Sequence, residues 1–416
     1  MRTNATVAAV VVALVSLSLA FVTAQKPKPV VRPASPVAAE TAAPPLERVA
    51  WMDLAKTPPM GWNSWNQFGC DVSEQLIRAS ADAMVSSGMK DAGYQYIVID
   101  DCWQVSRDKS GTIVADPQRF ASGMKALGDY IHSKGLKFGV YSDAGSKTCQ
   151  GRPGSNGYED VDARQYAAWG VDYLKYDWCS TDGVDPKIAY PTMRDALKAS
   201  GRPIVFSMCE WGSHQPWTWA RGVAHLWRTT GDIGNTWNGR DSFHRLLDQQ
   251  VDLAKFAGPG GWNDPDMLEV GVRLNDTGLT IPENRAHFSL WCAIAAPLMA
   301  GNDIRQMAPE IRDILTNKEV IAIDQDPLGV EGRRVRKEGA LEVWAKRLQG
   351  GGQAVILFNR GTTEAPIAVS WQELGMRYDA EPMVRDLWAH KDVGRVKGTF
   401  SATVAPHDVV VVRVTP

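Results

Sequence analysis

A lysine and an aspartate lie two residues apart in a short apolar stretch near the middle of the chain. Lys175 and Asp177 belong to residues 173–179, which follow Gly170 and are predicted to form a strand because they are few and rich in aromatic residues. Residues two apart in a strand share a face, so the ammonium and the carboxylate point the same way. Such a pair is either a salt bridge of the core or a carboxylate kept ionised for use as a nucleophile.

Polar residues also follow the other short apolar stretches of the first two thirds of the chain. They are Asn63, Asp100 and Asp101, Tyr141 and Asp143, Glu210, Arg228 and Asp232, Asp264 and Asp266, and Asn302 and Asp303. A single aspartate after a strand is commonly a helix N-cap. A polar group after each of eight strands instead favours one shared site.

Carboxylates and tryptophans dominate this set, which suits a sugar ligand. Aromatic rings stack on the apolar faces of a sugar while polar groups bind its hydroxyls. Two carboxylates that flank a glycosidic bond are the usual machinery of its hydrolysis. The tryptophans at or just past strand ends are Trp65, Trp103, Trp178 and Trp211. The sequence shows no serine nucleophile elbow and no metal-ligand spacing of histidines, and it therefore predicts no metal site.

Strands and helices alternate from about residue 60 to residue 323. The predicted strands are 60–62, 96–100, 137–141, 173–177, 203–209, 225–228, 261–264 and 298–301, and the predicted helices include 73–92, 123–134, 160–169, 191–200, 242–256 and 282–295. Eight such units predict a (β/α)8 TIM barrel, whose active site lies at the carboxyl ends of the strands. A doubly wound open sheet is disfavoured because no glycine-rich phosphate loop follows an early strand.

After Gly329 the pattern becomes all-β. Strands are predicted at 340–346, 353–359, 367–370, 383–386 and 409–414, with glycine-rich turns between them. We therefore expect a catalytic barrel over residues 49–329 and a C-terminal antiparallel β-sandwich domain over residues 330–416.

The N-terminal residues resemble an export signal. An apolar run from Ala8 to Ala20 precedes small residues near Ala24, which predicts a signal peptide over residues 1–24. A Pro/Ala-rich linker is expected over residues 25–48. These features predict a secreted or periplasmic protein without stable membrane insertion after cleavage, and an uncleaved anchor is the alternative. Charges nearly balance, with 45 Lys+Arg against 47 Asp+Glu, so no nucleic-acid partner is expected.

Four of the six cysteines follow neighbouring predicted strands. Cys70 and Cys102 follow the first and second strands, and Cys149 and Cys179 follow the third and fourth. Export favours disulfides, so we expect two bridges that brace the rim of the barrel. Cys209 and Cys292 fall inside a strand and a helix, where buried free thiols are expected.

Five motifs together resemble family 27 of the glycoside hydrolases, in particular its plant and microbial α-galactosidases. The motifs are Met60-Gly-Trp-Asn-Ser-Trp65, Ile99-Asp-Asp-Cys-Trp103, Lys175-Tyr-Asp177, Cys209-Glu-Trp-Gly212 and Gly260-Gly-Trp-Asn-Asp-Pro-Asp-Met267. They are long and in order, and the similarity runs from about residue 54 into the β domain.

The resemblance implies a retaining exo-glycosidase that removes terminal α-D-galactose without a cofactor. It implies that Asp177 is the nucleophile and Asp232 the general acid/base, and that Asp100 and Asp101 hold the galactose O4 and O6 hydroxyls. The other implied pocket residues are Trp65, Tyr141, Cys149, Lys175, Cys179, Glu210, Trp211, Arg228 and Asp266. The implied substrate is an α-galactoside oligosaccharide, polysaccharide or glycoconjugate.

Two sister activities and a non-catalytic galactose-binding barrel are the alternatives. α-N-Acetylgalactosaminidases carry small residues where this chain has Glu210 and Trp211, and β-L-arabinopyranosidases alter the acidic pair that is intact here as Asp100 and Asp101. We expect Glu210 and Trp211 to crowd the sugar 2-position. We also expect Lys175 to lower the pKa of Asp177 and the pKa of Asp232 to lie higher, as their roles require.

Overall fold

The computed structural model describes residues 50–416. The predicted signal peptide and linker, residues 1–24 and 25–48, lie outside the described residues. No helix in the described part of the chain combines the length and the apolar character that crossing a membrane requires.

Eight parallel strands form the central sheet, which confirms the predicted barrel architecture. Neighbouring strands are hydrogen-bonded in the order β10-β1-β2-β5-β6-β7-β8-β9. Between β9 and β10 a single bridge from Leu268 to Ala300 replaces a ladder and joins the two ends of the sheet. The strands are β1 (Met60–Asn63), β2 (Tyr96–Ile99), β5 (Lys137–Asp143), β6 (Tyr173–Asp177), β7 (Val205–Cys209), β8 (Leu226–Arg228), β9 (Trp262–Asp264) and β10 (Leu298–Ala300).

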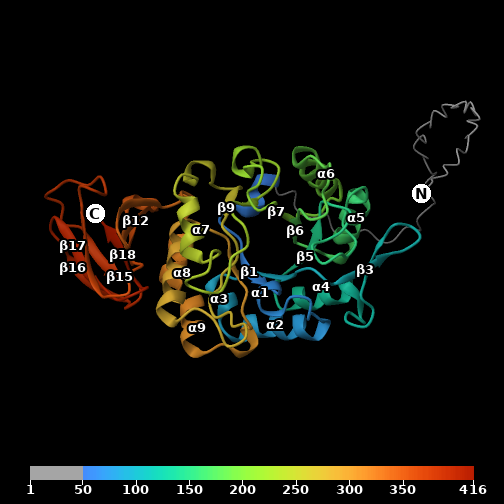
Figure 1. The fold of residues 1–416 in the computed structure, drawn as a ribbon, viewed down its shortest axis with the longest axis horizontal. Coiled ribbons are helices and arrows are strands. Elements are labelled where there is room, and N and C mark those ends of the chain that lie inside the picture. The colour runs from blue at the N-terminus through green and yellow to red at the C-terminus, as the bar shows by residue number, and fades with distance from the viewer. Residues whose placement is uncertain (1–49) are drawn as a thin grey trace, which may run out of the picture. The chain divides into compact units, whose positions relative to one another are not determined.

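Helices follow the strands and pack around the sheet (Figure 1). They are α1 (Trp65–Phe68), α2 (Glu74–Ser86), α3 (Met89–Ala92), α4 (Gly123–Ser133), α5 (Glu159–Trp169), α6 (Pro186–Ala199), α7 (Phe243–Gln250), α8 (Ile281–Ala293), α9 (Pro309–Leu315) and α10 (Lys318–Asp324). Local chemistry sets several starts, since Ser73 caps α2 by accepting a bond from the Leu76 amide and Thr280 forms a capping box with Glu283 on α8. A small hairpin of β3 (Gln104–Arg107) and β4 (Ile113–Ala115) follows β2.

The predicted helix over 73–92 is two helices. The chain breaks at Gly88, whose φ of 85° lies in the left-handed region that glycine adopts without strain. The helix expected from Pro191 begins earlier, at Pro186, because Asp185 caps it by accepting a hydrogen bond from the Lys187 amide. Pro191 therefore lies inside α6.

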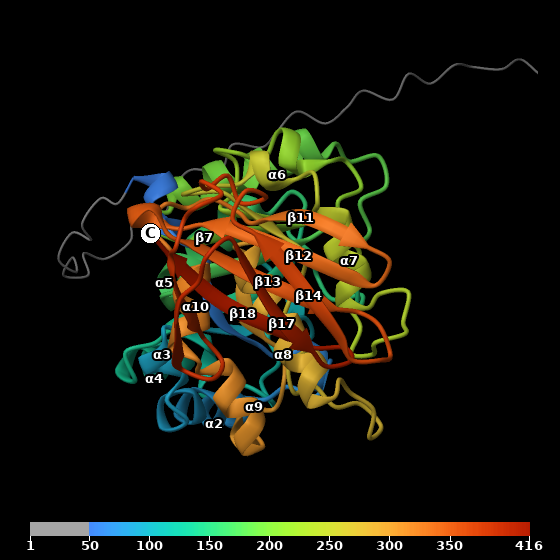
Figure 2. The ribbon, with the colours of Figure 1, turned by 90° about the vertical axis from the view of Figure 1, so that its left-hand side faces the viewer.

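The C-terminal strands form the expected antiparallel sandwich. One sheet has the order β11-β12-β13-β18-β15-β16, and β14 pairs with β17 in a second. Figure 2 looks onto these strands. Their shared core contains Val355, Leu357, Val369, Phe400 and Val412. The strands are β11 (Arg333–Glu338), β12 (Leu341–Arg347), β13 (Gln353–Asn359), β14 (Ala365–Ser370), β15 (Met383–Asp386), β16 (Lys391–Arg395), β17 (Thr399–Val404) and β18 (Val409–Thr415).

Helix α8 is buried on nearly all sides because it lies between the barrel and the sandwich. It packs against α9 and α10 of the barrel and against β12, β13 and β18 of the sandwich. From the sheet side, the buried ammonium of Lys346 donates to the backbone oxygens of Cys292 and Asp324, and Arg285 of α8 pairs with Asp408. One apolar core thus continues from the barrel into Trp344 and Ile356.

Candidate active site

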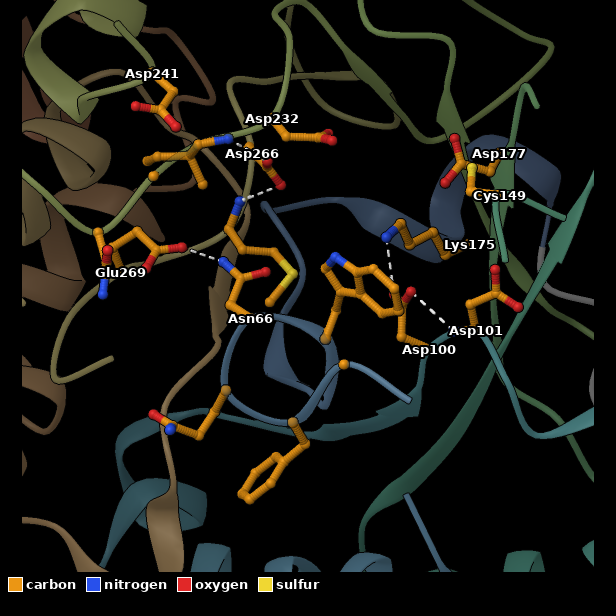
Figure 3. Close-up of a pocket in the computed structure, with 18 of the residues that line it drawn as sticks. Asn66, Asp100, Asp101, Cys149, Lys175, Asp177, Asp232, Asp241, Asp266 and Glu269 are labelled. Carbon is orange, nitrogen blue, oxygen red and sulfur yellow. Dashed lines mark hydrogen bonds and ion pairs between the residues drawn. The ribbon is translucent and has the colours of Figure 1, made fainter. Parts of the chain in front are cut away.

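A pocket of about 640 Å³ opens at the carboxyl ends of the barrel strands. Figure 3 shows Asp177, Lys175 and Asp100 toward one end and Asp241, Asn66 and Glu269 toward the other. All but two of the site residues that the family resemblance implies line this pocket. They are Trp65, Asp100, Asp101, Tyr141, Cys149, Lys175, Asp177, Trp211, Arg228, Asp232 and Asp266. The pocket lining does not include five other residues that follow strands, which are Asn63, Asp143, Asp264, Asn302 and Asp303.

Lys175 lies on the same strand face as Asp177, and its direct partner is a third residue. Its Nζ is 2.8 Å from Oδ2 of Asp100. The same oxygen also accepts a 2.7 Å hydrogen bond from the side-chain amide of Asn63. Asp100 is fully buried and Asp177 is 5% exposed. The ammonium is therefore held in place by Asp100, and it affects the pKa of Asp177 through its charge alone.

The neighbouring carboxylate of Asp101 is held by backbone amides. Its oxygens accept from the amides of Cys102, at 2.6 Å, and Gln150, at 2.9 Å. Burial raises the pKa of Asp101, although these hydrogen bonds act against the increase. The hydroxyl of Tyr141 lies beside this group and donates to the sulfur of Cys149 at 3.4 Å.

Arg228 organises the opposite wall. Its guanidinium lies 2.9 Å from both Asp232 and Asp266. Asp266 is buried and also accepts from the backbone amides of Ile233 and Met267. The side chain of Asp232 is 73% exposed to the pocket, whereas Arg228 is buried. Asp232 is thus a carboxylate that is held by the buried guanidinium of Arg228 and remains accessible to a ligand in the pocket.

The pKa order of the two proposed catalytic acids in this structure is opposite to the expected one. Burial raises the pKa of Asp177 to about 6, and this outweighs the opposing effect of Lys175. Burial also raises the pKa of Asp232, but the charges of Arg228 and Lys175 and the hydrogen bond from Arg228 outweigh it, so the pKa lies below its usual value. Lys175 does lower the pKa of Asp177, as expected, but the expected order of the two values was wrong, because burial dominates at Asp177 and Arg228 binds Asp232 directly.

Glu210 and Cys179 do not line the pocket. Glu210 is 0% exposed, and its carboxylate accepts from the backbone amide of His214 and pairs with the ring of that residue. Trp211, the next residue, has a left-handed φ of 54° and lines the pocket. The expectation that Glu210 crowds the sugar was therefore wrong, and Trp211 alone reaches the pocket wall.

The cysteines form the two expected bridges. Cys70 is bonded to Cys102, and Cys149 to Cys179, with Cα–Cα distances of 5.2 and 5.1 Å. Cys149 faces the pocket, and Cys179 lies behind it. Cys209 and Cys292 are free and buried, as the sequence predicted. The sulfur of Cys209 accepts a 3.3 Å hydrogen bond from Arg228.

The wider end of the pocket contains residues that the sequence analysis missed. Glu269 is buried, accepts from the side chain of Asn66, and has its pKa raised to about 8 by burial. The exposed carboxylate of Asp241 lies on the same side. Neither acid directly follows a strand, which is why a search at strand ends did not find them. Asn66 was detectable, because it lies one residue after Trp65.

The sequence of this barrel matches a known family model. Residues 57–326 match the model described as alpha galactosidase A, and residues 338–414 match the alpha galactosidase C-terminal beta sandwich domain. The chain belongs to the α-galactosidase family. This is the family that the five motifs resemble, and membership makes the protein a glycoside hydrolase.

Named relatives agree with the family assignment. Alpha-galactosidase A of Cellvibrio japonicus is 52% identical, over 87% of this chain and 93% of that protein. Among solved structures, α-galactosidase I of Mortierella vinacea has a TM-score of 0.84 and 39% identity, covering 87% of this chain and 97% of that one. The Saccharomyces cerevisiae α-galactosidase solved with raffinose has a TM-score of 0.81 and 31% identity, covering 88% and 99%.

Proposed function

We propose that this family member hydrolyses terminal non-reducing α-D-galactose from galactosides by a retaining double displacement. Asp177 attacks the anomeric carbon and forms a galactosyl-enzyme while Asp232 protonates the leaving oxygen. Asp232 then removes a proton from water, which attacks the same carbon and releases galactose with its configuration retained. The observation that carries the proposal is that two carboxylates, one buried and one open, share one pocket in a chain of this family.

The buried end of the pocket suits a galactose ring. Asp100 and Asp101 are fixed by Lys175 and by backbone amides, and each retains lone pairs for sugar hydroxyls. In this proposal they bind O4 and O6, and Trp65 and Trp211 supply the aromatic walls. The raffinose bound to the yeast relative makes a galactosyl oligosaccharide the first substrate to test.

The low pKa of Asp232 is compatible with the role of an acid only if substrate changes it. A bound galactoside would cover the exposed carboxylate and remove its water, and burial raises a carboxyl pKa. The basic limb of the kcat profile reports the enzyme–substrate complex, and the basic limb of kcat/KM reports the free enzyme. We therefore expect the first to lie at higher pH than the second.

The test is galactose release from raffinose and from aryl α-galactosides, with the anomer of the first product read by proton NMR. Asp177→Asn should abolish turnover and leave the fold intact, because the change is isosteric. Asp129→Asn, at an exposed position on α4, is the matched control and should be fully active. A first product of inverted configuration, or normal activity of Asp177→Asn, would remove Asp177 from the mechanism.

The same experiment separates the alternatives. Aryl β-L-arabinopyranoside and aryl α-N-acetylgalactosaminide are offered beside the galactoside at equal concentration. The proposal predicts the highest kcat/KM for galactose, and binding without turnover would indicate a galactose-binding barrel.

A further inference from the structure

A second aspartate lies directly beside Asp177 on the neighbouring strand. Asp143 ends β5, and the parallel register of β5 and β6 pairs Asp143 with Asp177. On the other side, Asp177 pairs with Cys209 of β7. Asp143 is 0% exposed and does not line the pocket. The proposed nucleophile therefore has a buried carboxyl group as its lateral neighbour.

Asp143 is tied to the segments on either side of the Cys149–Cys179 bridge. One of its carboxyl oxygens accepts from the amide of Gly145 at 2.6 Å, and the other accepts from the amide of Cys179 at 2.8 Å. Cys179 lies two residues after Asp177, so this second bond holds the chain just beyond the nucleophile. The Ala144 amide donates to the backbone oxygen of Asp177 at 2.9 Å and completes the tie.

The two carboxyl groups are close enough to share one charge. Oxygens of Asp143 and Asp177 and the two disulfide sulfurs all lie within 4.8 Å of one another. Two carboxylates in one buried site do not both ionise near neutral pH. Their surroundings decide which one keeps the proton.

The positive groups of the site face Asp177. Lys175 and Arg228 both favour its ionised form. The titratable groups near Asp143 are acids, and the charges of Asp177 in β6 and of Asp101 after β2 raise its pKa. A negative charge on Asp143 would in turn raise the pKa of three buried tyrosine hydroxyls. These belong to Tyr141, Tyr176 and Tyr190. Among residues 50–416, no lysine, arginine or histidine forms an ion pair with Asp143.

We propose that Asp143 is a positioning residue of this site, a carboxyl that stays protonated while Asp177 is ionised and that holds the end of β6 through the Cys179 amide. The inference rests on the proposed function of Asp177 and adds to it the group that keeps this carboxylate in place. Burial and the neighbouring Asp177 raise the pKa of Asp143 to about 8, and they outweigh the opposing effect of the hydrogen bonds from the Gly145 and Cys179 amides.

The acid limb of the pH profile in Asp143→Asn tests where the proton is. If Asp143 is neutral in the working enzyme, replacing it by a neutral amide leaves the charge beside Asp177 unchanged. The acid limb of kcat, which reports Asp177 in the enzyme–substrate complex, should then stay within about half a pH unit of the wild-type limb. If Asp143 carries a negative charge, its loss lowers the pKa of Asp177. A downward shift of the limb by one pH unit or more would overturn the proposal.

The amount of activity tests positioning. Asn keeps one of the two acceptor atoms, whereas Ala keeps neither. We expect a loss of about tenfold in kcat for Asp143→Asn and of about a hundredfold for Asp143→Ala, because small displacements of a reacting group cost about that much. Wild-type kcat in a folded Asp143→Ala enzyme would show that Asp143 positions nothing.

Thermal unfolding and infrared spectroscopy give readouts that need no activity. The pKa of Asp143 is higher in the folded than in the unfolded chain. Its contribution therefore lowers the free energy of unfolding as pH rises from about 4 to about 8. The Tm of Asp143→Asn relative to wild type should rise across that window. Other buried acids such as Glu269 and Glu331 also absorb there, so the infrared readout is the difference spectrum of wild type minus Asp143→Asn at pH 7. It should show the loss of one protonated carboxyl stretch, and the absence of that difference band would refute the assignment.

Glu331→Gln is the matched control. Glu331 is a buried acid whose pKa burial also raises to about 8, and it does not line the pocket. This variant should show a similar pH dependence of Tm with unchanged kcat. If the wild type lacks galactosidase activity, the proposed function fails, but Tm and the infrared band still test the protonation of Asp143.

Discussion

Replacing Lys175 by methionine should separate its two effects, one on stability and one on Asp177. The ammonium forms a 2.8 Å ion pair with Asp100, which is fully buried. Removing one partner of a buried pair costs about 3–5 kcal/mol, because the other charge is left uncompensated. Unfolding of Lys175→Met should show a loss of that size.

The same change should move the acid limb of activity. Lys175 opposes the rise in the pKa of Asp177, which lies at about 6. Loss of a nearby opposite charge raises a carboxyl pKa by about one unit or more. At pH 6 the ionised fraction of Asp177 should fall from about one half to about one tenth. In the enzyme–substrate complex, where the substrate raises the pKa of Asp232, Asp177 sets the acid limb of kcat. That limb should therefore move up by about one pH unit or more.

The assay is kcat for an aryl α-galactoside between pH 4 and pH 9, on protein shown to be folded by circular dichroism. Lys137→Met is the matched control, because Lys137 starts a barrel strand at the opposite end and its ammonium lies 5.1 Å from the Tyr96 ring centroid. This control should leave the limb in place. A folded Lys175→Met enzyme whose acid limb of kcat matches that of the wild type would refute the electrostatic argument.

Three further changes test other walls of the pocket. Replacing both Cys149 and Cys179 by serine should cost about 3–4 kcal/mol of unfolding free energy, since the bridge spans 30 residues, and about a hundredfold in kcat, measured by denaturant melts and initial rates. Trp211→Ala should raise kcat/KM for the N-acetylgalactosaminide relative to the galactoside by about tenfold, and an unchanged ratio would exclude Trp211 as the specificity wall. Asp232→Asn should lose about 100- to 10,000-fold in kcat/KM on raffinose but much less on an aryl galactoside with an activated leaving group, which needs no proton.

Much of the barrel was predictable because its strands are short apolar runs that end in polar residues. The run at residues 173–177 is β6 itself, and the other seven predicted strands overlap β1, β2, β5, β7, β8, β9 and β10. The missed elements lack that signal. β11 reads Arg-Arg-Val-Arg-Lys-Glu, an exposed edge strand with almost no apolar alternation. α9 and α10 are single seven-residue segments, too short to show a helical period.

The site was predictable in its residues but less so in its electrostatics. Motif positions led to the pocket, yet nothing in the sequence shows that Lys175 pairs with Asp100 instead of Asp177. Nor does the sequence show that the carboxylate of Glu210 binds the backbone amide and the ring of His214 instead of facing the pocket. Asp143 was visible as a residue after the third strand, but its relation to Asp177 depends on the register of two strands, which only the structure shows.

The sharing of α8 between barrel and sandwich has a consequence for how the enzyme fails on heating. The buried ammonium of Lys346 donates to the backbone oxygens of Cys292 and Asp324. Separating the sheet from the barrel would break these hydrogen bonds and expose the apolar residues of α8 to water. We therefore expect the barrel and the sandwich to unfold together. Heat should inactivate the enzyme in one step. A substitution that improves the packing around Trp344 or Ile356 should lengthen the half-life of galactosidase activity at high temperature, although neither residue lines the pocket.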